Sequence, residues 1–322
     1  MKRTTLFALL ALAPAAACDT DSDDTTFQDQ LDTVEFRTTG PVPTTPGLYA
    51  RLFDLSTGPQ RAYLLYLPPG YDHTRPEPYE MIFMFHGGGQ SALSFAGRPG
   101  MLELHDHAEA EDRIVVFLQG TEGATVWTPG YWETDPTVRN DLLYTEELLD
   151  HLEANLNVDT DRVFAGGFSN GGRFVHELGS ELTGRFLALA AVGSYYGTTT
   201  SEPAGPPPGS VVPIYIVSSA DDQVLPYNGG VGVGASGNDF LSQQYGYDSW
   251  YADNGCTVPT HRINLVGAHY DKTTCVAGTY HNVIEWVTVD DMDFPPNDHA
   301  WPTLDNAGYP ATNGMLNFWD QQ

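Results

Sequence analysis

Ser169 lies at the centre of the pentapeptide Gly167–Gly171, in which a glycine stands two residues to either side of the serine. Apolar residues 163–166 precede this motif, and residues 171–182 carry apolar side chains at four-residue steps, the spacing of a helix face. The pattern predicts a buried strand that turns sharply at Ser169 into a helix, a geometry that exposes a serine hydroxyl for attack. Because a serine needs a base to take its proton, a histidine and a carboxylate should accompany it.

Ten histidines compete for the role of that base. In a parallel sheet, functional groups sit on loops at the carboxyl ends of strands, so the base should follow a late strand. His299 meets this requirement, because it lies in the loop after residues 283–289, the last predicted strand. The other nine precede the serine, fall on predicted helices, or lie within or at the start of late strands: His73, His86, His105, His107, His151, His176, His261, His269 and His281.

Two adjacent carboxylates, Asp221 and Asp222, follow the predicted strand 211–217 at its carboxyl end. Both lie between Ser169 and His299, and the chain order Ser, Asp, His is one in which catalytic triads occur. The residue types alone leave both aspartates open. The pattern predicts a hydrolase that forms an acyl-enzyme on its serine, and it calls for neither a metal nor a cofactor.

Predicted strands and helices alternate along residues 36–322, which favours one large α/β domain with a mostly parallel sheet and helices on both faces. The expected strands are residues 61–68, 81–85, 114–118, 163–166, 186–192, 211–217 and 283–289, and the expected helices are residues 101–110, 141–155, 171–182, 239–253 and 312–320. The glycine- and proline-rich pieces between them are interpreted as surface loops.

Four motifs occur in one order along the chain: His86–Gln90 (HGGGQ), Gly167–Gly172 (GFSNGG), Asp222–Tyr227 (DQVLPY) and His299–Pro302 (HAWP). With these motifs the chain resembles the polyhydroxybutyrate-depolymerase and feruloyl-esterase group of α/β-hydrolases, including its lipoprotein-like members. The resemblance implies an α/β-hydrolase fold and a serine esterase for neutral ester or polymer-ester substrates, such as polyhydroxyalkanoate, feruloyl or acetyl esters. Ser218–Ala220 departs from the His-Gly-Thr that family members usually carry there, which bears on the rim of the pocket.

The resemblance assigns Ser169 as the nucleophile and His299 as the base. It selects Asp222 over Asp221 as the carboxylate that orients the histidine, because the family places its aspartate four residues before the proline of the Pro-Tyr pair. Two more functions fit parts of the same pattern. A serine peptidase on this fold would use the same triad, and a catalytically silent surface-binding protein could retain the scaffold.

Two backbone N–H groups should bind the oxyanion of the tetrahedral intermediate. One belongs to Asn170, the residue after the nucleophile, and the other to a glycine after His86, with Gly88 as the first choice and Gly87 as the next. A side chain at this glycine would crowd the oxyanion. One such donor typically contributes a factor of about 10² to 10³ in turnover.

Aromatic residues are candidates for the wall of the substrate site. Trp127 and Trp132 fall in a long loop after the strand at residues 114–118, at the end of the sheet where a substrate wall is expected. Trp301, two residues after His299, is a third candidate. Aromatic faces suit sugar or phenolic ligands, and ordinary packing beneath a loop is the alternative.

The composition is strongly acidic, with 14 Lys and Arg residues against 42 Asp and Glu residues and a net charge of −28. Such a charge excludes nucleic acid as a plausible partner and disfavours strongly anionic substrates, so a neutral ester is expected. The acidic stretch 290–298 offers oxygen ligands for Ca²⁺, but a solvated loop is favoured and no metal is predicted.

Residues 1–17 combine two basic residues, an apolar run and small residues before Cys18, the pattern of a signal peptide. We expect export, either as a lipoprotein acylated at Cys18, where the sequence resembles a lipobox, or as a freely secreted protein. Membrane contact would then pass only through that anchor. Residues 18–35, acidic and without basic residues, predict a flexible tether. Cys256 and Cys275 are expected to form a disulfide in an exported domain.

Overall fold

The computed structural model describes residues 26–37, 40–120, 127, 141–197, 205–206, 210–233, 238–256, 261–265, 267–273 and 283–322. Within these ranges the elements, in chain order, are α1 (Phe27–Thr33), β1 (Phe36–Arg37), β2 (Gly47–Phe53), β3 (Arg61–Leu67), β4 (Tyr79–Phe85), α2 (Ala92–Ala96), α3 (Pro99–Ala110), β5 (Ile114–Leu118), α4 (Asp141–Asn155), β6 (Val158–Phe168), α5 (Asn170–Glu181), β7 (Ala188–Val192), β8 (Ile214–Ser219), β9 (Gly230–Val231), β10 (Asp239–Phe240), α6 (Gln243–Asp253), β11 (His261–Leu265), β12 (Ala268–Thr273), β13 (Ile284–Val289), α7 (Leu304–Ala307) and α8 (Ala311–Trp319).

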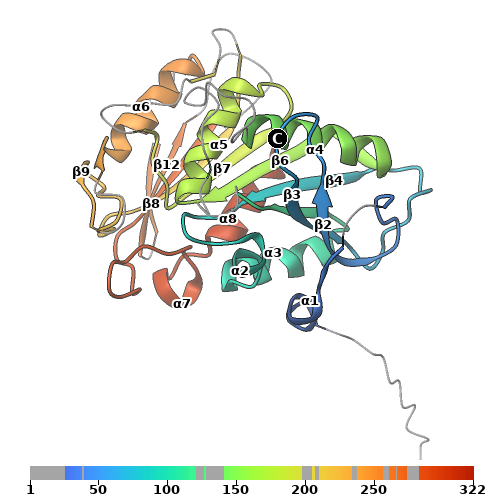
Figure 1. Ribbon diagram of the computed structural model, residues 1–322. Coiled ribbons are helices and arrows are strands. Elements are labelled where there is room, and N and C mark those ends of the chain that lie inside the picture. Colours follow the sequence, from blue (N-terminus) through green and yellow to red (C-terminus); the bar gives the residue numbers. More distant parts are fainter. Residues whose placement is uncertain are drawn as a thin grey trace, which may run out of the picture.

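One sheet of eleven strands runs through the molecule in the order β1-β2-β3-β5-β4-β6-β7-β8-β13-β12-β11 (Figure 1). The central strands β5, β4, β6, β7, β8 and β13 are parallel to their neighbours within this group. Antiparallel pairs flank the group, β3 on β5 at one side and β12 on β13 at the other. The mostly parallel sheet is therefore confirmed, and the carboxyl ends of its central strands meet at one edge, where ligands bind in such sheets.

Helices cover both faces of the sheet, as predicted (Figure 1). On one face, α4, α5 and α6 bury Leu148, Phe174 and Trp250 in a core that includes Phe83 of β4. On the other face, α1, α2, α3 and α8 form a second core with the neighbouring Met84. Both faces of β4 are thus closed to solvent from Met81 to Phe85, which explains why these five residues form an uninterrupted apolar run.

Helix α1 corrects the prediction of a flexible tether for residues 27–33, whereas residues 18–25 lie outside the described ranges. Thr26 begins the helix with a capping box, and Phe27 and Leu31, four residues apart, are 6% and 4% exposed. The ring of Phe27 stacks on His105 of α3 at 3.9 Å between centroids. Although the segment is acidic, Phe27 and Leu31 lie on one face of the helix. Their burial docks α1 on the domain.

Several predictions fall on residues that the structure does not describe. These are the signal peptide at residues 1–17, acylation at Cys18, and the identity of the partner of Cys256. Cys256 is disulfide-bonded, and pairing with Cys275 remains a prediction because Cys275 lies outside the described ranges. No helix in the described part of the chain combines the length and apolar character that crossing a membrane requires.

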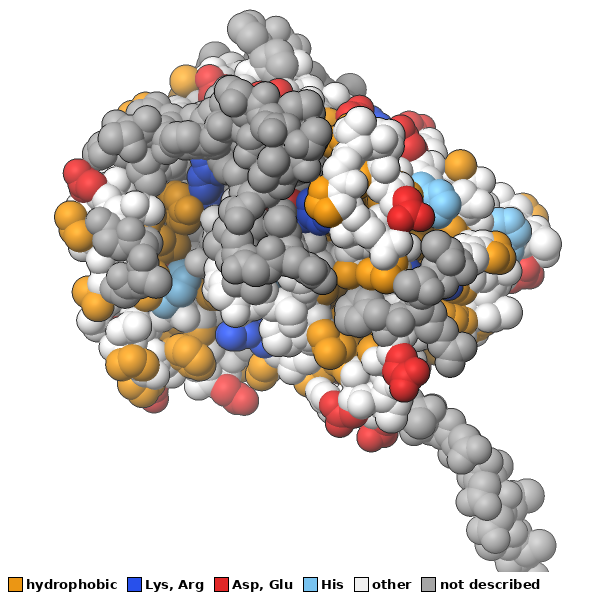
Figure 2. Space-filling model, in the orientation of Figure 1, with side chains coloured by type: hydrophobic (Ala, Val, Ile, Leu, Met, Phe, Trp, Pro, Cys, Tyr) orange, Lys and Arg blue, Asp and Glu red, His pale blue; other side chains and the backbone are white. Residues whose placement is uncertain are grey.

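The surface reflects the acidic excess of the sequence. In the view of Figure 2, acidic side chains lie mostly toward the edges, with few basic side chains among them. Several arginines are engaged by carboxylates, such as Arg113, which contacts Glu80, Glu111 and Asp320. Ion pairing of this kind lowers the number of basic groups that could face a polyanion such as nucleic acid.

Candidate active site

The turn between β6 and α5 holds Ser169 at φ 53° and ψ −117°, a backbone conformation that non-glycine residues rarely adopt. Its N–H donates to the carbonyl of Val192 on β7 at 3.0 Å, and its own carbonyl accepts from the N–H of Arg173 at 2.9 Å. Strain of this kind costs about 1–3 kcal/mol and persists where the surroundings enforce it. Ser169, at the end of β6, is only partly buried.

The glycines of the serine motif permit close approach between α5 and the sheet. A Cβ on Gly171 would lie 2.2 Å from the carbonyl oxygen of Phe85 and 2.5 Å from that of His86. A Cβ on Gly167 would lie 2.5 Å from the backbone of Gly171. Helix α5 therefore begins directly against the end of β4, which brings the loop after β4 next to the serine.

Loops at the carboxyl ends of β6, β8 and β13 bring Ser169, Asp222 and His299 together. Nε2 of His299 lies 2.9 Å from Oγ of Ser169, and Nδ1 of His299 lies 2.6 Å from Oδ2 of Asp222. The imidazole also stacks on Phe168 at 5.0 Å between ring centroids. A proton on Nδ1 would donate to the carboxylate and leave Nε2 free to accept the serine proton.

Asp222 faces His299, and Asp221 does not. The Oδ1 atom of Asp222 accepts hydrogen bonds from the backbone N–H groups of residues 224–225 at 2.8 and 2.9 Å, which leaves Oδ2 for the imidazole. Asp221 instead accepts the N–H of Met292 at 3.0 Å and so ties the loop after β8 to the segment after β13. The two neighbouring carboxylates therefore have different tasks.

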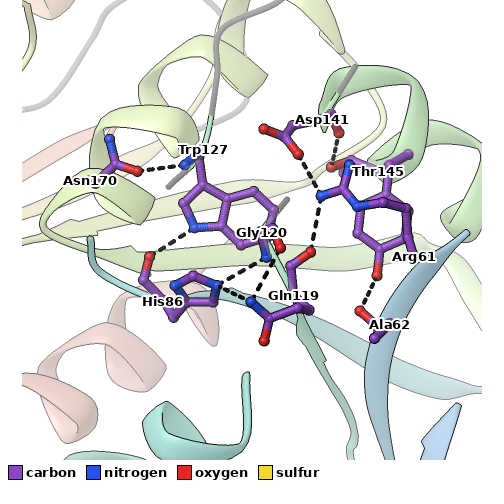
Figure 3. A network of polar contacts seen from close by, with 10 residues as sticks. Arg61, Ala62, His86, Gln119, Gly120, Trp127, Asp141, Thr145 and Asn170 are labelled. Carbon is purple, nitrogen blue, oxygen red and sulfur yellow. Dashed lines mark hydrogen bonds and ion pairs between the residues drawn. The ribbon is translucent and has the colours of Figure 1, made fainter. Parts of the chain in front are cut away.

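His86 holds the loop after β4 and is completely buried. The N–H of Gly120 donates to its Nε2 at 2.9 Å (Figure 3). The ring proton therefore resides on Nδ1, which donates to the carbonyl of Gly87 at 2.9 Å. Burial lowers the pKa of His86 to about 4, because the charged ring would lose its hydration. His86 is therefore neutral near pH 7, and its ring fixes the loop rather than serving as a base.

The two glycines proposed as oxyanion donors differ in whether their N–H groups are engaged. The N–H of Gly87 donates to Oε1 of Gln90 at 3.0 Å and is occupied. Neither Gly88 nor Asn170 donates its backbone N–H to another residue in the described ranges. Asn170 is the first residue of α5, where helix geometry leaves N–H groups without partners and favours negative charge.

Two of the tryptophans predicted to line the substrate site are core residues instead. Trp127 and Trp301 are 2% and 3% exposed. Trp127 stacks on Phe174 at 5.4 Å between centroids, and the indole N–H of Trp301 donates to Oγ1 of Thr312 at 3.0 Å. Burial of large rings with satisfied N–H groups stabilises the fold, so the wall prediction is wrong for both. Trp132 lies outside the described residues.

The acidic stretch 290–298 has no arrangement suited to a cation. Asp290 lies 3.1 Å from Nδ1 of His269, and Asp298 accepts the N–H of Phe294 at 3.2 Å. Among the residues that the structure describes, no group of three or more His, Cys, Asp or Glu side chains could hold a metal ion. These aspartates make local contacts in a largely exposed loop.

A family model described as the dienelactone hydrolase family matches residues 115–230 of the chain. The matched region is just over a third of the chain. It runs from β5 to the start of β9 and includes Ser169 and Asp222, but it ends before His299.

Among curated proteins, a putative esterase, NocK, of Nocardia uniformis subsp. tsuyamanensis is 28% identical over 172 residues, which cover 53% of this chain and 48% of that protein. Feruloyl esterase B of Piromyces equi is 25% identical over 203 residues, or 61% of this chain and 36% of that protein. A probable feruloyl esterase C of Aspergillus niger is 25% identical over 219 residues, or 65% and 76%. The chain thus spans about half or less of the first two relatives.

Among solved structures, an acetyl xylan esterase from Aspergillus awamori has a TM-score of 0.58 at 12% identity and covers 86% of this chain and 100% of that one. A thermostable esterase has a TM-score of 0.53 at 16% identity and covers 85% of this chain and 63% of that one. At such identities the likeness concerns the fold. The protein therefore has an α/β-hydrolase fold, and over residues 115–230 it is similar to the dienelactone hydrolase family.

Proposed function

We propose that the protein is a carboxylic-ester hydrolase whose catalytic triad is Ser169, Asp222 and His299. The observation that carries this proposal is the continuous chain of contacts from the carboxylate through the imidazole to the serine hydroxyl. The left-handed backbone at Ser169 adds to it, because it turns the hydroxyl away from the strand and toward the histidine.

In the proposed reaction, Nε2 of His299 takes the proton of Ser169 as Oγ attacks the ester carbonyl carbon. The N–H groups of Asn170 and Gly88 bind the oxyanion of the tetrahedral intermediate. Collapse of the intermediate breaks the bond to the alcohol, which leaves with the proton from His299. Water then gives a proton to His299 and attacks the acyl-enzyme, and the carboxylic acid leaves as the serine regains its proton.

The proposed substrates are neutral esters of small alcohols or of decorated polymers, with feruloyl, acetyl and polyhydroxyalkanoate esters as the candidates. Relatives named feruloyl esterase and a structural neighbour named acetyl xylan esterase support the first two. The net charge of −28 supports a neutral substrate, because a strongly negative protein repels anions at close range. A panel of these three ester classes, compared by kcat/KM, would rank them.

We also propose export through a signal peptide at residues 1–17, followed by acylation of Cys18. The disulfide at Cys256 supports an oxidising location, because such bonds are rare in reducing compartments. Cell fractionation should find the protein with the envelope, and a Cys18→Ser variant should be released into the soluble extracytoplasmic fraction. A wild-type protein that is already soluble outside the cell would contradict acylation and leave export intact.

The central experiment measures hydrolysis of p-nitrophenyl acetate and butyrate beside peptide p-nitroanilides. We expect ester cleavage to dominate and the Ser169→Ala variant to lose at least about 10⁴-fold in kcat, since the nucleophile is removed. Ser242→Ala, which alters only the serine that begins α6, is the matched control and should retain activity. Faster anilide cleavage would replace the esterase proposal with a peptidase.

A fluorophosphonate probe separates an active enzyme from a silent scaffold. The wild type should be labelled covalently at Ser169, and Ser169→Ala should not. Absence of labelling in the wild type, with the fold intact by circular dichroism, would favour a catalytically silent binding protein.

A further inference from the structure

Trp127 connects the two segments that carry the proposed oxyanion donors. Its backbone N–H donates to the side-chain Oδ1 of Asn170 at 2.6 Å, and its indole N–H donates to the carbonyl of His86 at 2.8 Å (Figure 3). Asn170 follows Ser169 at the start of α5, and His86 immediately precedes Gly87–Gly88. One side chain and its own backbone therefore reach both sides of the site.

The ring of Trp127 packs against the same two segments. It stacks on Phe174 of α5 at 5.4 Å and meets Phe85, at the end of β4, edge to face at 5.0 Å between centroids. The residue is 2% exposed, so water has little access to its hydrogen bonds. Polar and apolar contacts together hold the end of β4 and the start of α5 at one separation.

A second set of contacts fixes the opposite side of His86. Gly120 donates its N–H to the imidazole, and Nη2 of Arg61 donates to the carbonyl of Gln119 at 2.9 Å. The same Nη2 atom donates to the buried carboxylate of Asp141, the first residue of α4 (Figure 3). His86 is thus held between this anchored loop and Trp127, so the carbonyl that receives the indole N–H has little freedom to move.

We propose that Trp127 is a positioning residue that sets the distance between the N–H groups of Gly88 and Asn170. It acts through His86 and Asn170 and does not touch the substrate. The inference rests on the proposed esterase function. Oxyanion donors must lie about 2.7–3.1 Å from the developing negative oxygen, so a small displacement of either segment weakens transition-state binding. The oxyanion forms only after the serine attacks and is absent from bound substrate. Weaker binding of the oxyanion should therefore lower kcat and leave KM unchanged.

The Trp127→Phe variant tests this by removing the indole N–H while keeping the backbone N–H and an aromatic ring. We expect kcat for p-nitrophenyl acetate to fall about tenfold, less than the loss of a whole donor, with KM within about twofold of the wild type. The inhibition constant of an aryl trifluoromethyl ketone, whose hemiketal oxyanion occupies the same hole, should rise by a similar factor.

Trp250→Phe is the matched control. Trp250 is also fully buried and also donates one indole hydrogen bond, to Nδ1 of His176 at 2.8 Å, but it packs against Gly179 near the far end of α5. It should lose comparable stability and keep kcat and the ketone inhibition constant within about twofold of the wild type.

Asn170→Ala breaks the other contact of Trp127, because it removes the Oδ1 acceptor of the Trp127 backbone N–H and keeps the backbone N–H of residue 170. It should reproduce the kcat loss even if Trp127→Phe proves too unstable to assay. Unchanged kcat and ketone inhibition in both variants, with Ser169→Ala inactive, would refute the role of Trp127 and leave the esterase proposal standing. A raised KM with unchanged kcat would mean substrate contact and also refute it. An active Ser169→Ala would defeat the proposed function itself.

Discussion

Asp222 presents one carboxylate oxygen to His299 at 2.6 Å and gives the other to two backbone N–H groups of its own loop. This arrangement of the two oxygens determines how the side-chain amide of an asparagine at position 222 would be oriented. The oxygen of an asparagine must face the two N–H donors, which turns its NH₂ group toward Nδ1 of His299. The imidazole would then accept at Nδ1 and carry its proton on Nε2, where it could not take the proton of Ser169.

Asp222→Asn should therefore lower kcat for ester hydrolysis by about 10³- to 10⁴-fold with little change in KM. Asp221→Asn is the matched control, since this residue accepts from the backbone of Met292 and does not reach the imidazole. It should retain kcat within about threefold, because an amide oxygen can still accept that bond. Steady-state kinetics on both variants decides the point, and equal losses would show that the roles of the two carboxylates are misassigned.

Gly171→Ala should destabilise the fold by about 3 kcal/mol or more, because the new Cβ would meet the carbonyl oxygen of Phe85 at 2.2 Å. Backbone atoms cannot yield as a side chain could. Gly184→Ala is the control: this glycine has φ +83° but nothing within 4 Å of a Cβ, so only about 1 kcal/mol of backbone strain is expected. Urea unfolding of the two variants measures the difference, and similar losses would contradict the close-approach argument.

Phe27→Ala should lower the free energy of unfolding by about 3 kcal/mol, since a large buried aromatic ring leaves its contacts with His105 and Tyr66. Gln28→Ala alters the adjacent exposed position and should change stability by less than about 0.5 kcal/mol. Thermal or chemical unfolding reports both values. If the two variants were equally stable, α1 would not be docked on the domain in solution.

Stability should fall with acid partly because of His176. Its Nδ1 accepts the indole N–H of Trp250, and burial lowers the pKa of the folded protein's imidazole to about 3, against an ordinary value near 6.5. Between pH 6.5 and about pH 3, His176 is protonated in the unfolded chain and neutral in the folded protein. The free energy of unfolding therefore falls as pH decreases through this window, by about 3 kcal/mol at pH 4 from this residue.

His176→Gln keeps an acceptor in place of the imidazole without the titration. Chemical unfolding at pH 7 and pH 4 should show a smaller loss for this variant than for the wild type. Carboxylates and the buried His86 titrate in both proteins, so the difference between the two losses isolates His176. Parallel losses would mean that His176 is protonated in the fold or solvated by local opening.

The strand at residues 114–118 and the helix at residues 141–155 occur within the predicted bounds as β5 and α4. Their patterns are unambiguous because β5 is buried on both faces and α4 carries a long apolar stripe. Strand β2 was missed because it lies near the sheet edge, where only Ala50 among its seven residues is buried. A strand with so little buried surface leaves no clear alternation in its sequence.

Helix α6 begins four residues later than predicted. Ser242 caps it by accepting the N–H of Tyr245, and Asp239–Phe240 instead pairs with Gly230–Val231 in a small separate sheet. The acidic composition predicts disorder at α1, where Thr26 and Asp29 form a capping box. Composition alone does not identify this helix, because its docking depends on only two apolar side chains, Phe27 and Leu31.

At the site, the glycine-flanked motif selected Ser169, and the position after the last predicted strand selected His299; the structure brings the two side chains together. The residues alone could not separate Asp221 from Asp222, because the direction of each side chain depends on the loop conformation, which the sequence pattern does not specify. The role of Trp127 was out of reach for another reason. Its indole meets a carbonyl 41 residues earlier in the chain, a contact that no local pattern encodes.

The imidazole of His299 lies 130 residues after the hydroxyl that it contacts, and it follows β13, the last of the described strands along the chain. The serine and its proposed base therefore depend on different parts of the sheet, since β6 pairs with β4 and β7 whereas β13 pairs with β8. Under the proposed triad, local opening of β13 would separate the base from a serine that stays in place. Fraying of this one strand would then silence ester hydrolysis while most of the sheet remains folded.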